Sequence, residues 1–151
     1  MARYDLTIDA GIEAYCEDLA KAGTEHAHQR AFFAWLNVMQ YQDKHSMARM
    51  AFAIPNGGFR DKITAGKLKA EGVKAGVADI CYPLPQASNG YLSLWLEMKK
   101  PKVGRSSAEQ SDWAIDMRVC GHAVSTCWGW RAARQAFIDY SRGCLVQEEY
   151  A

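Results

Sequence analysis

The sequence has 151 residues, 49% of them hydrophobic, and a formal net charge of +1. This length predicts one domain over residues 1–151 and is too short for two domains of ordinary size. No apolar run reaches the roughly 18 residues of a membrane span, and the N-terminal residues lack the basic start and apolar centre of a signal peptide, so we expect a cytoplasmic protein without a membrane partner.

Two helices are predicted in the first part of the chain. Residues 9–22 have apolar positions near helical spacing, and Gly23 can stop the helix that they form. We expect this helix to pack against the rest of the domain. The second helix covers residues 25–42, because Thr24 is a suitable N-cap. Its apolar stripe comprises Phe32, Trp35, Leu36 and Met39.

The next segment combines a turn with basic residues. Residues 46–54 are ambiguous at their start and strand-like at their end, and the PNGG sequence at residues 55–58 forces a turn. Residues 59–71 are polar and basic. They predict a loop followed by a short helix that ends at Gly72.

Two strands are predicted at the centre of the sequence. Residues 77–82 (VADICY) and 91–99 (YLSLWLEMK) are rich in β-branched and aromatic residues, with proline, serine, asparagine and glycine between them. Side chains alternate faces along a strand, so Glu97 and Lys99 point the same way. This pattern places an acid and a base beside a second acid, Asp79, on the neighbouring strand.

The C-terminal part predicts two helices around one strand. A helix starts near Ser106 or Ser107, since Ser107 and Gln110 have the spacing of a capping box. Residues 122–129 indicate a strand, residues 130–143 a closing helix, and the remaining tail is polar. We expect the first of these helices to bury Trp113, Met117 and Cys120 or Gly121.

These elements predict an α/β fold in two or three layers. A small mixed sheet of about four strands has helices on its faces, with the acid-bearing strands at its centre.

Cysteine and histidine positions argue against a zinc site. The cysteines are odd in number, lack C-x-x-C spacing and have mostly apolar neighbours, so we expect reduced core residues. His26 and His28 diverge on their helix, and His45 and His122 stand alone, so we expect structural or solvated histidines. The five cysteines are Cys16, Cys81, Cys120, Cys127 and Cys144.

An Asp followed by Glu-x-Lys on the next strand is the spacing of the PD-(D/E)xK nucleases. Further motifs narrow the match: IPNGG at residues 54–58, KLKAEGVKAGVADI at 67–80, EMKKPK at 97–102 and SSAEQSDW at 106–113. Together they resemble the virus-type replication-repair nuclease (VRR-NUC) family over about residues 25–140. The resemblance implies a restriction-endonuclease-like core.

Hydrolysis of a phosphodiester needs cations that offset charge, which one or two Mg²⁺ or Mn²⁺ ions supply. Asp79 and Glu97 are ligands of the type that Mg²⁺ prefers, and converging acids repel one another unless a cation is present. By resemblance, Glu25 completes a second metal position and the Met98 carbonyl is a further ligand. Lys99 would orient the attacking water or stabilise transition-state charge.

Two of the candidate residues also have complete structural explanations. Glu25 lies in the first turn of a helix, where the macrodipole favours an acid. Gln110 closes a capping box. In the family, the Glu of an E-x-x-x-Q motif, here Glu25 and Gln29, helps hold metal, and a Gln after the E-x-K strand faces the site. We therefore retain Gln110 among the catalytic candidates.

Basic residues flank the proposed site on both sides. Cations there would hold DNA phosphates by charge without reading the base sequence. The alternative is a solvated lysine-rich surface. The candidate DNA-binding residues are Arg60, Lys62, Lys67, Lys69, Lys74, Lys100, Lys102 and Arg105.

Three functions remain open from the sequence. The first is a metal-dependent endonuclease that cuts branched DNA such as four-way (Holliday) junctions, the second a nuclease for flaps, nicks or ends, and the third a catalytically silent DNA-binding protein. The small size and the resemblance to virus-encoded members imply a homodimer, which suits paired cuts across a junction. They also imply a phage protein in a bacterial cytoplasm. No nucleotide cofactor is expected.

Overall fold

A five-stranded mixed sheet forms the centre of the computed structural model, which describes residues 4–43, 46–55 and 62–151 and only the main chain of Lys62. The predicted α/β fold is confirmed. The predicted PNGG turn, His45 and Arg60 lie wholly or mainly outside the described residues. In spatial order the strands are β1 (Phe52–Ala53), β2 (Ile80–Tyr82), β3 (Leu94–Lys99), β4 (Ala123–Trp128) and β5 (Glu149–Tyr150).

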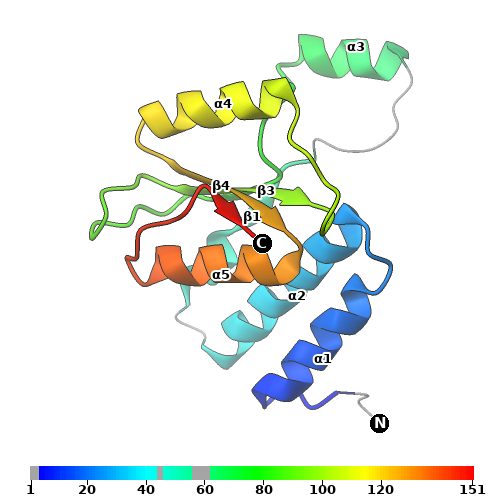
Figure 1. Ribbon diagram of the computed structural model, residues 1–151, viewed down its shortest axis with the longest axis vertical. Helices are drawn as coiled ribbons and strands as arrows, with labels where there is room; N and C mark the ends of the chain where they lie inside the picture. Colours follow the sequence, from blue (N-terminus) through cyan, green and yellow to red (C-terminus); the bar gives the residue numbers. More distant parts are fainter. Residues whose placement is uncertain (1–3, 44–45, 56–61) are drawn as a thin grey trace.

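The pairing of the strands changes from antiparallel to parallel at β3. The β1–β2 and β2–β3 pairs are antiparallel, whereas β3, β4 and β5 are mutually parallel. Figure 1 shows helices on both faces of this sheet. One face carries α1 (Asp9–Ala20), α2 (Glu25–Gln42) and α5 (Trp130–Ser141); α4 (Ala108–Val119) lies over the other, α3 (Lys62–Ala70) stands apart from the sheet, and a 3₁₀ turn covers Met47–Met50.

The two faces of β3 have different chemistry. Leu94, Leu96 and Met98 are at most 1% exposed and join the hydrophobic core with α2 and α5. Glu97 and Lys99 lie on the opposite face, toward α4. The alternation that the sequence predicts for this strand is therefore confirmed, with one apolar face and one that carries charge.

Side-chain caps explain where two helices begin. The Thr24 hydroxyl accepts from the Ala27 N–H at 3.1 Å, and α2 has the predicted bounds. Ser107 and Gln110 form the predicted capping box at the start of α4. By contrast, Gly129 begins α5 with no side-chain cap and a φ of 95°.

The structure corrects several expectations. A fifth strand lies in the polar tail, where Tyr150 is buried and pairs with Cys127. Cys120 and Cys144 are exposed, not core residues. No residue of α4 is buried, and Trp113 and Met117 are only half-buried. The physical reason is that α4 covers a partly charged sheet face and has no further layer over it in Figure 1.

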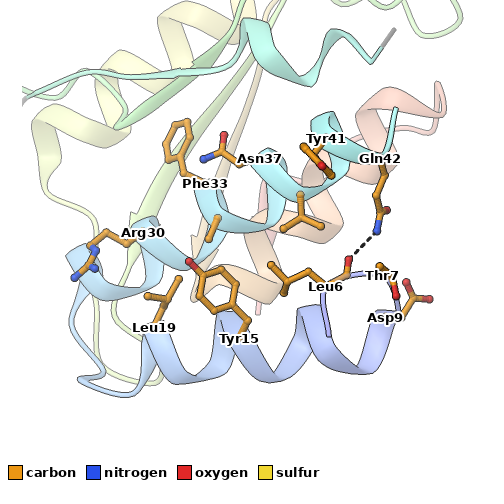
Figure 2. A pocket seen from close by; sticks show the side chains of 12 residues that line it. Leu6, Thr7, Asp9, Tyr15, Leu19, Arg30, Phe33, Asn37, Tyr41 and Gln42 are labelled. Carbon is orange, nitrogen blue, oxygen red and sulfur yellow. Dashed lines mark hydrogen bonds between the residues drawn. The ribbon is translucent and has the colours of Figure 1, made fainter. Parts of the chain in front are cut away.

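Helix α1 packs along α2 and leaves an apolar groove of about 910 Å³ between them. Figure 2 shows Tyr15, Leu19 and Phe33 along this groove, with Arg30 and Asp9 near its opposite ends. Among the described helices, none is both long and apolar enough to cross a membrane.

Candidate active site

Asp79 lies directly before β2, not within a strand as the sequence predicts, and the main chain of β3 holds its carboxylate. Its Oδ2 accepts the Met98 N–H at 2.8 Å, and its main-chain oxygen accepts the Ile54 N–H at 2.7 Å. Burial raises the pKa of Asp79, while the Met98 hydrogen bond and the Lys99 cation oppose that shift. The carboxyl group is therefore fixed at the place where β2 and β3 separate.

Glu97 and Lys99 form a buried pair under α4, and the half-buried Gln110 of that helix contacts both. Glu97 and Lys99 are 6% and 4% exposed, and the Lys99 Nζ donates to the Glu97 Oε1 at 2.9 Å. Gln110 donates its Nε2 hydrogen to the same Glu97 oxygen and accepts from Lys99 Nζ at 2.9 Å. Because both charges are buried, the pair is not a solvated surface ion pair.

Gln110 has two structural roles at once. Its Oε1 accepts the Ser107 N–H at 2.8 Å as part of the capping box, and it also accepts from Lys99. The start of α4 therefore holds the side chain that contacts both charged residues of β3. The helix-cap explanation and the placement at the site are compatible.

The acids influence one another electrostatically. Burial and then the Asp79 carboxylate raise the pKa of Glu97 to about 7, although Lys99 acts in the opposite direction. The Glu25 carboxylate also raises the pKa of both Asp79 and Glu97. Negative charge is thus concentrated around the end of β3, where a cation would stabilise it.

These acids approach β3 from both faces of the sheet. Glu25 is exposed at the start of α2 and lines a cleft of about 960 Å³ together with Asp79, Met98 and Lys100. Glu97 instead lines a hollow of about 280 Å³ on the α4 side. Within the described ranges, no three His, Cys, Asp or Glu side chains lie close enough together to form a preformed metal site.

The donor atoms nevertheless fit a hard divalent cation. Carboxylates and main-chain carbonyls are the ligands that Mg²⁺ and Mn²⁺ prefer. The Met98 N–H points toward β2, where it donates to Asp79. A residue in a strand directs its N–H and C=O to the same side, so the Met98 carbonyl also points toward β2. Asp79, Glu97, Glu25 and the Met98 carbonyl therefore supply oxygen donors around one strand end.

Two glycines that the sequence did not indicate as site residues, Gly76 and Gly104, allow close contacts between the segments that carry the polar groups. Gly76 has a φ of 84°, and a Cβ there would clash with the Glu109 carbonyl oxygen in α4. A Cβ on Gly104 would lie 2.8 Å from Cβ of Lys99. The turn before Asp79 thus contacts the helix that carries Gln110. The sequence feature that could have indicated this turn is Gly76, the second glycine of the GVKAGVADI motif.

The described DNA-binding candidates are exposed. Lys67 and Lys69 lie on α3, which stands away from the sheet in Figure 1, and Lys100 lines the cleft beside Asp79. Arg60 lies outside the described residues, and no side chain is described for Lys62. The exposed cations are Lys67, Lys69, Lys74, Lys100, Lys102 and Arg105.

The fold and the polar group at the end of β3 together define an α/β domain with a Glu-x-Lys pair on β3 and an Asp directly before the adjacent strand β2. No protein-family model matches the sequence, and no curated protein matches it. Among solved structures, a VRR_NUC domain protein superimposes with a TM-score of 0.66 at 18% sequence identity, covering 85% of this chain and 96% of that chain. The chain therefore has the fold of a VRR_NUC domain protein, as the motif resemblance predicts.

Proposed function

We propose that the protein is a metal-dependent DNA nuclease of the VRR-NUC family. The observation that carries this proposal is the buried Glu97–Lys99 pair, contacted by Gln110, beside Asp79 at the end of β3. A buried acid with a raised pKa, a specific charged partner and a neighbouring cleft is typical of functional sites. The shared fold with a VRR_NUC domain protein agrees with it.

Asp79, Glu97, Glu25 and the Met98 carbonyl would hold the metal. When bound, Mg²⁺ or Mn²⁺ supplies a Lewis acid for the phosphate and lowers the pKa of a coordinated water. The hydrogen bond from the Met98 N–H would keep the Asp79 carboxylate in position to bind the metal. These oxygen donors would come from α2, β3 and the residue before β2, and would hold one or two cations at the end of β3.

Lys99 and Gln110 would act on the reacting groups from the α4 side. The Lys99 ammonium would orient the attacking water and offset charge on the phosphate. Gln110 fixes the direction of both Lys99 and Glu97 through its amide. The burial of Lys99 favours this role, because a charge in a low-dielectric setting acts more strongly than one in water.

DNA would approach across the exposed cations. Lys100 lines the cleft itself, while Lys67 and Lys69 project from α3. Such contacts bind phosphates by charge, so affinity would fall with increasing salt and depend little on base sequence. Lys74, Lys102 and Arg105 would extend the same surface, with Arg60 and Lys62 as further members.

The substrate proposed is branched DNA such as a four-way junction, cut by a homodimer. Its support is the small size of the chain and the motif resemblance to virus-encoded members, which also favour a phage protein that works in a bacterial cytoplasm. Two copies would supply two sites and a larger surface for choosing a substrate. A monomer by light scattering at the concentration of the cleavage assay would contradict this assembly.

The test is cleavage of labelled four-way junction, flap, nicked, duplex and single-stranded DNA with Mg²⁺, Mn²⁺ or EDTA. Wild type is compared with Asp79→Asn. Paired junction cuts that EDTA and the substitution abolish are expected. Cleavage mainly of flaps, nicks or ends would keep the site but change the substrate. Junction binding without any cleavage in either protein would overturn the nuclease and leave a DNA-binding protein.

A further inference from the structure

The first turn of α5 receives a hydrogen-bond acceptor from α2. Gly129, the N-cap of α5, offers no side chain to the helix's first N–H groups, and buried N–H groups at a helix start need partners. The Trp130 N–H donates to Nδ1 of His28 at 3.3 Å, and Trp130 is only 1% exposed. His28 therefore replaces the capping side chain that Gly129 lacks.

The same corner of the chain also contacts the end of β3. The Gly129 N–H donates to the Lys99 carbonyl oxygen at 3.1 Å. A Cβ on Gly129 would lie 3.2 Å from Cγ of Pro101 and 3.5 Å from Nδ1 of His28. The corner between β4 and α5 thus lies between His28 and the residues that end β3.

His28 belongs to the part of α2 that carries a candidate metal ligand. It follows Glu25 by three residues, and side chains at this spacing are neighbours on a helix surface. Burial lowers the pKa of His28, with the Glu17 carboxylate opposing that shift. Accepting at Nδ1 requires a ring that carries no proton on that nitrogen, so the neutral ring holds its proton on Nε2.

We propose that His28 is a positioning residue for the candidate site. It fixes the first turns of α2, and with them Glu25, relative to the end of β3 that carries Met98 and Lys99. It acts through Glu25 and does not itself touch the metal. This inference rests on the proposed metal-dependent function.

The test is Mn²⁺ affinity, measured by titration calorimetry on the full chain. His28→Leu removes the acceptor and is expected to weaken Mn²⁺ binding by about tenfold, the scale of lost outer-shell contacts in metal sites. His28→Asn places an amide oxygen near the Nδ1 position and is expected to restore most of the affinity. Equal affinities for His28→Leu and wild type would overturn the inference.

A double-mutant cycle separates positioning from general structural damage. If His28 acts through Glu25, then His28→Leu causes no further loss of Mn²⁺ affinity in a Glu25→Gln background. The same fold-loss in both backgrounds would overturn the proposal, because it would show that the effect does not pass through Glu25.

His122→Leu is the matched control. Its Nδ1 is also hydrogen-bonded, to the Ser93 hydroxyl at 2.7 Å, but at the opposite ends of β3 and β4. Mn²⁺ affinity is expected to stay at the wild-type value in this variant, and a loss equal to that of His28→Leu would count against the inference.

Two further outcomes have defined meanings. If His28→Leu does not fold, His28→Gln is compared with His28→Asn, since the longer side chain moves the acceptor away from the Nδ1 position. Weaker binding by His28→Gln supports the proposal, and equal binding overturns it. A wild type that binds no Mn²⁺ overturns the proposed function and this inference together, whereas wild-type binding that His28→Leu leaves unchanged overturns this inference alone.

Discussion

Two hollows of nearly equal volume differ in what lines them. The cleft at the end of β3 measures about 960 Å³ and contains Asp79 and Glu25. The groove between α1 and α2 measures about 910 Å³, and Tyr15, Leu19 and Phe33 line it (Figure 2). Volume therefore does not separate the two hollows.

Anchored charge separates the two hollows. In the cleft, a main-chain N–H holds the Asp79 carboxylate, and burial raises its pKa. In the groove, Asp9 and Arg30 are exposed near opposite ends, with apolar side chains between them. A partly buried carboxylate that the fold holds in place and whose pKa is raised marks a functional site better than volume does.

The largest expected effect compares an acid from each hollow. Asp79→Asn keeps an acceptor for the Met98 N–H but removes the metal-binding charge, and we expect cleavage to fall on the order of 10³-fold because a bound metal contributes several kcal/mol. Asp9→Asn, at the groove, is expected to leave cleavage unchanged. Rates from single-turnover assays measure both, and an equal loss in the two variants would remove the distinction between the hollows.

The second effect is the pH dependence of metal affinity at the end of β3. The Glu97 carboxyl has a pKa of about 7 and must lose its proton to bind a cation. Mn²⁺ affinity should therefore rise by up to about tenfold per pH unit below 7 and level off above it. Affinity that is constant from pH 5.5 to 8 would contradict the assignment.

The same pKa shift predicts the sign of a stability change. The ordinary pKa of a glutamate is 4.5, so the folded, metal-free state binds the proton more tightly than the unfolded state does. This contribution is fully present below about pH 4.5 and is lost as pH rises through 7. Glu97→Gln should therefore show a smaller decrease in Tm over that interval than wild type.

A further prediction concerns the turn at Gly76, which precedes Asp79 and contacts α4. Gly76→Ala adds a Cβ against the Glu109 carbonyl at a positive φ, and should lower the free energy of unfolding by about 2–4 kcal/mol. The matched control is Gly66→Ala in α3, where no atom lies within 4 Å of the added Cβ. That substitution should be neutral or stabilise the protein by less than about 1 kcal/mol. Urea unfolding of both variants measures the difference.

Much of this arrangement was predictable because its signals are local. Thr24, Ser107 and the two-residue alternation of Glu97 and Lys99 act over a few residues, so helix starts and the shared face follow from the sequence. The family motifs supplied the order of the acids. These signals identify the candidate residues around the end of β3.

The unpredicted features depend on long-range contacts. His28 reaches Trp130, 102 residues away, and no local pattern indicates that pairing. The burial of Glu97 under Gln110 requires the placement of α4. Strand β5 forms in a polar tail because β4 offers it an edge, where Tyr150 is buried. Such contacts are properties of the assembled fold.

The smallest expected effect concerns the charges outside the cleft. Lys67→Ala combined with Lys69→Ala should reduce the salt dependence of DNA binding by about 1–2 units of slope, since each phosphate contact contributes about 0.9. Arg142→Ala, at the end of α5, should not change the slope. Binding titrations at several salt concentrations measure it, and identical slopes for wild type and the double variant would exclude α3 from the DNA-binding surface.

The most direct test of the account is the position of Mn²⁺ in a crystal, located by its anomalous scattering. We expect an anomalous-difference peak for a Mn²⁺ ion coordinated by the carboxylates of Asp79 and Glu97 at the end of β3. This peak should be absent from Asp79→Asn crystals. Full Mn²⁺ occupancy elsewhere, with none at the end of β3, would contradict it.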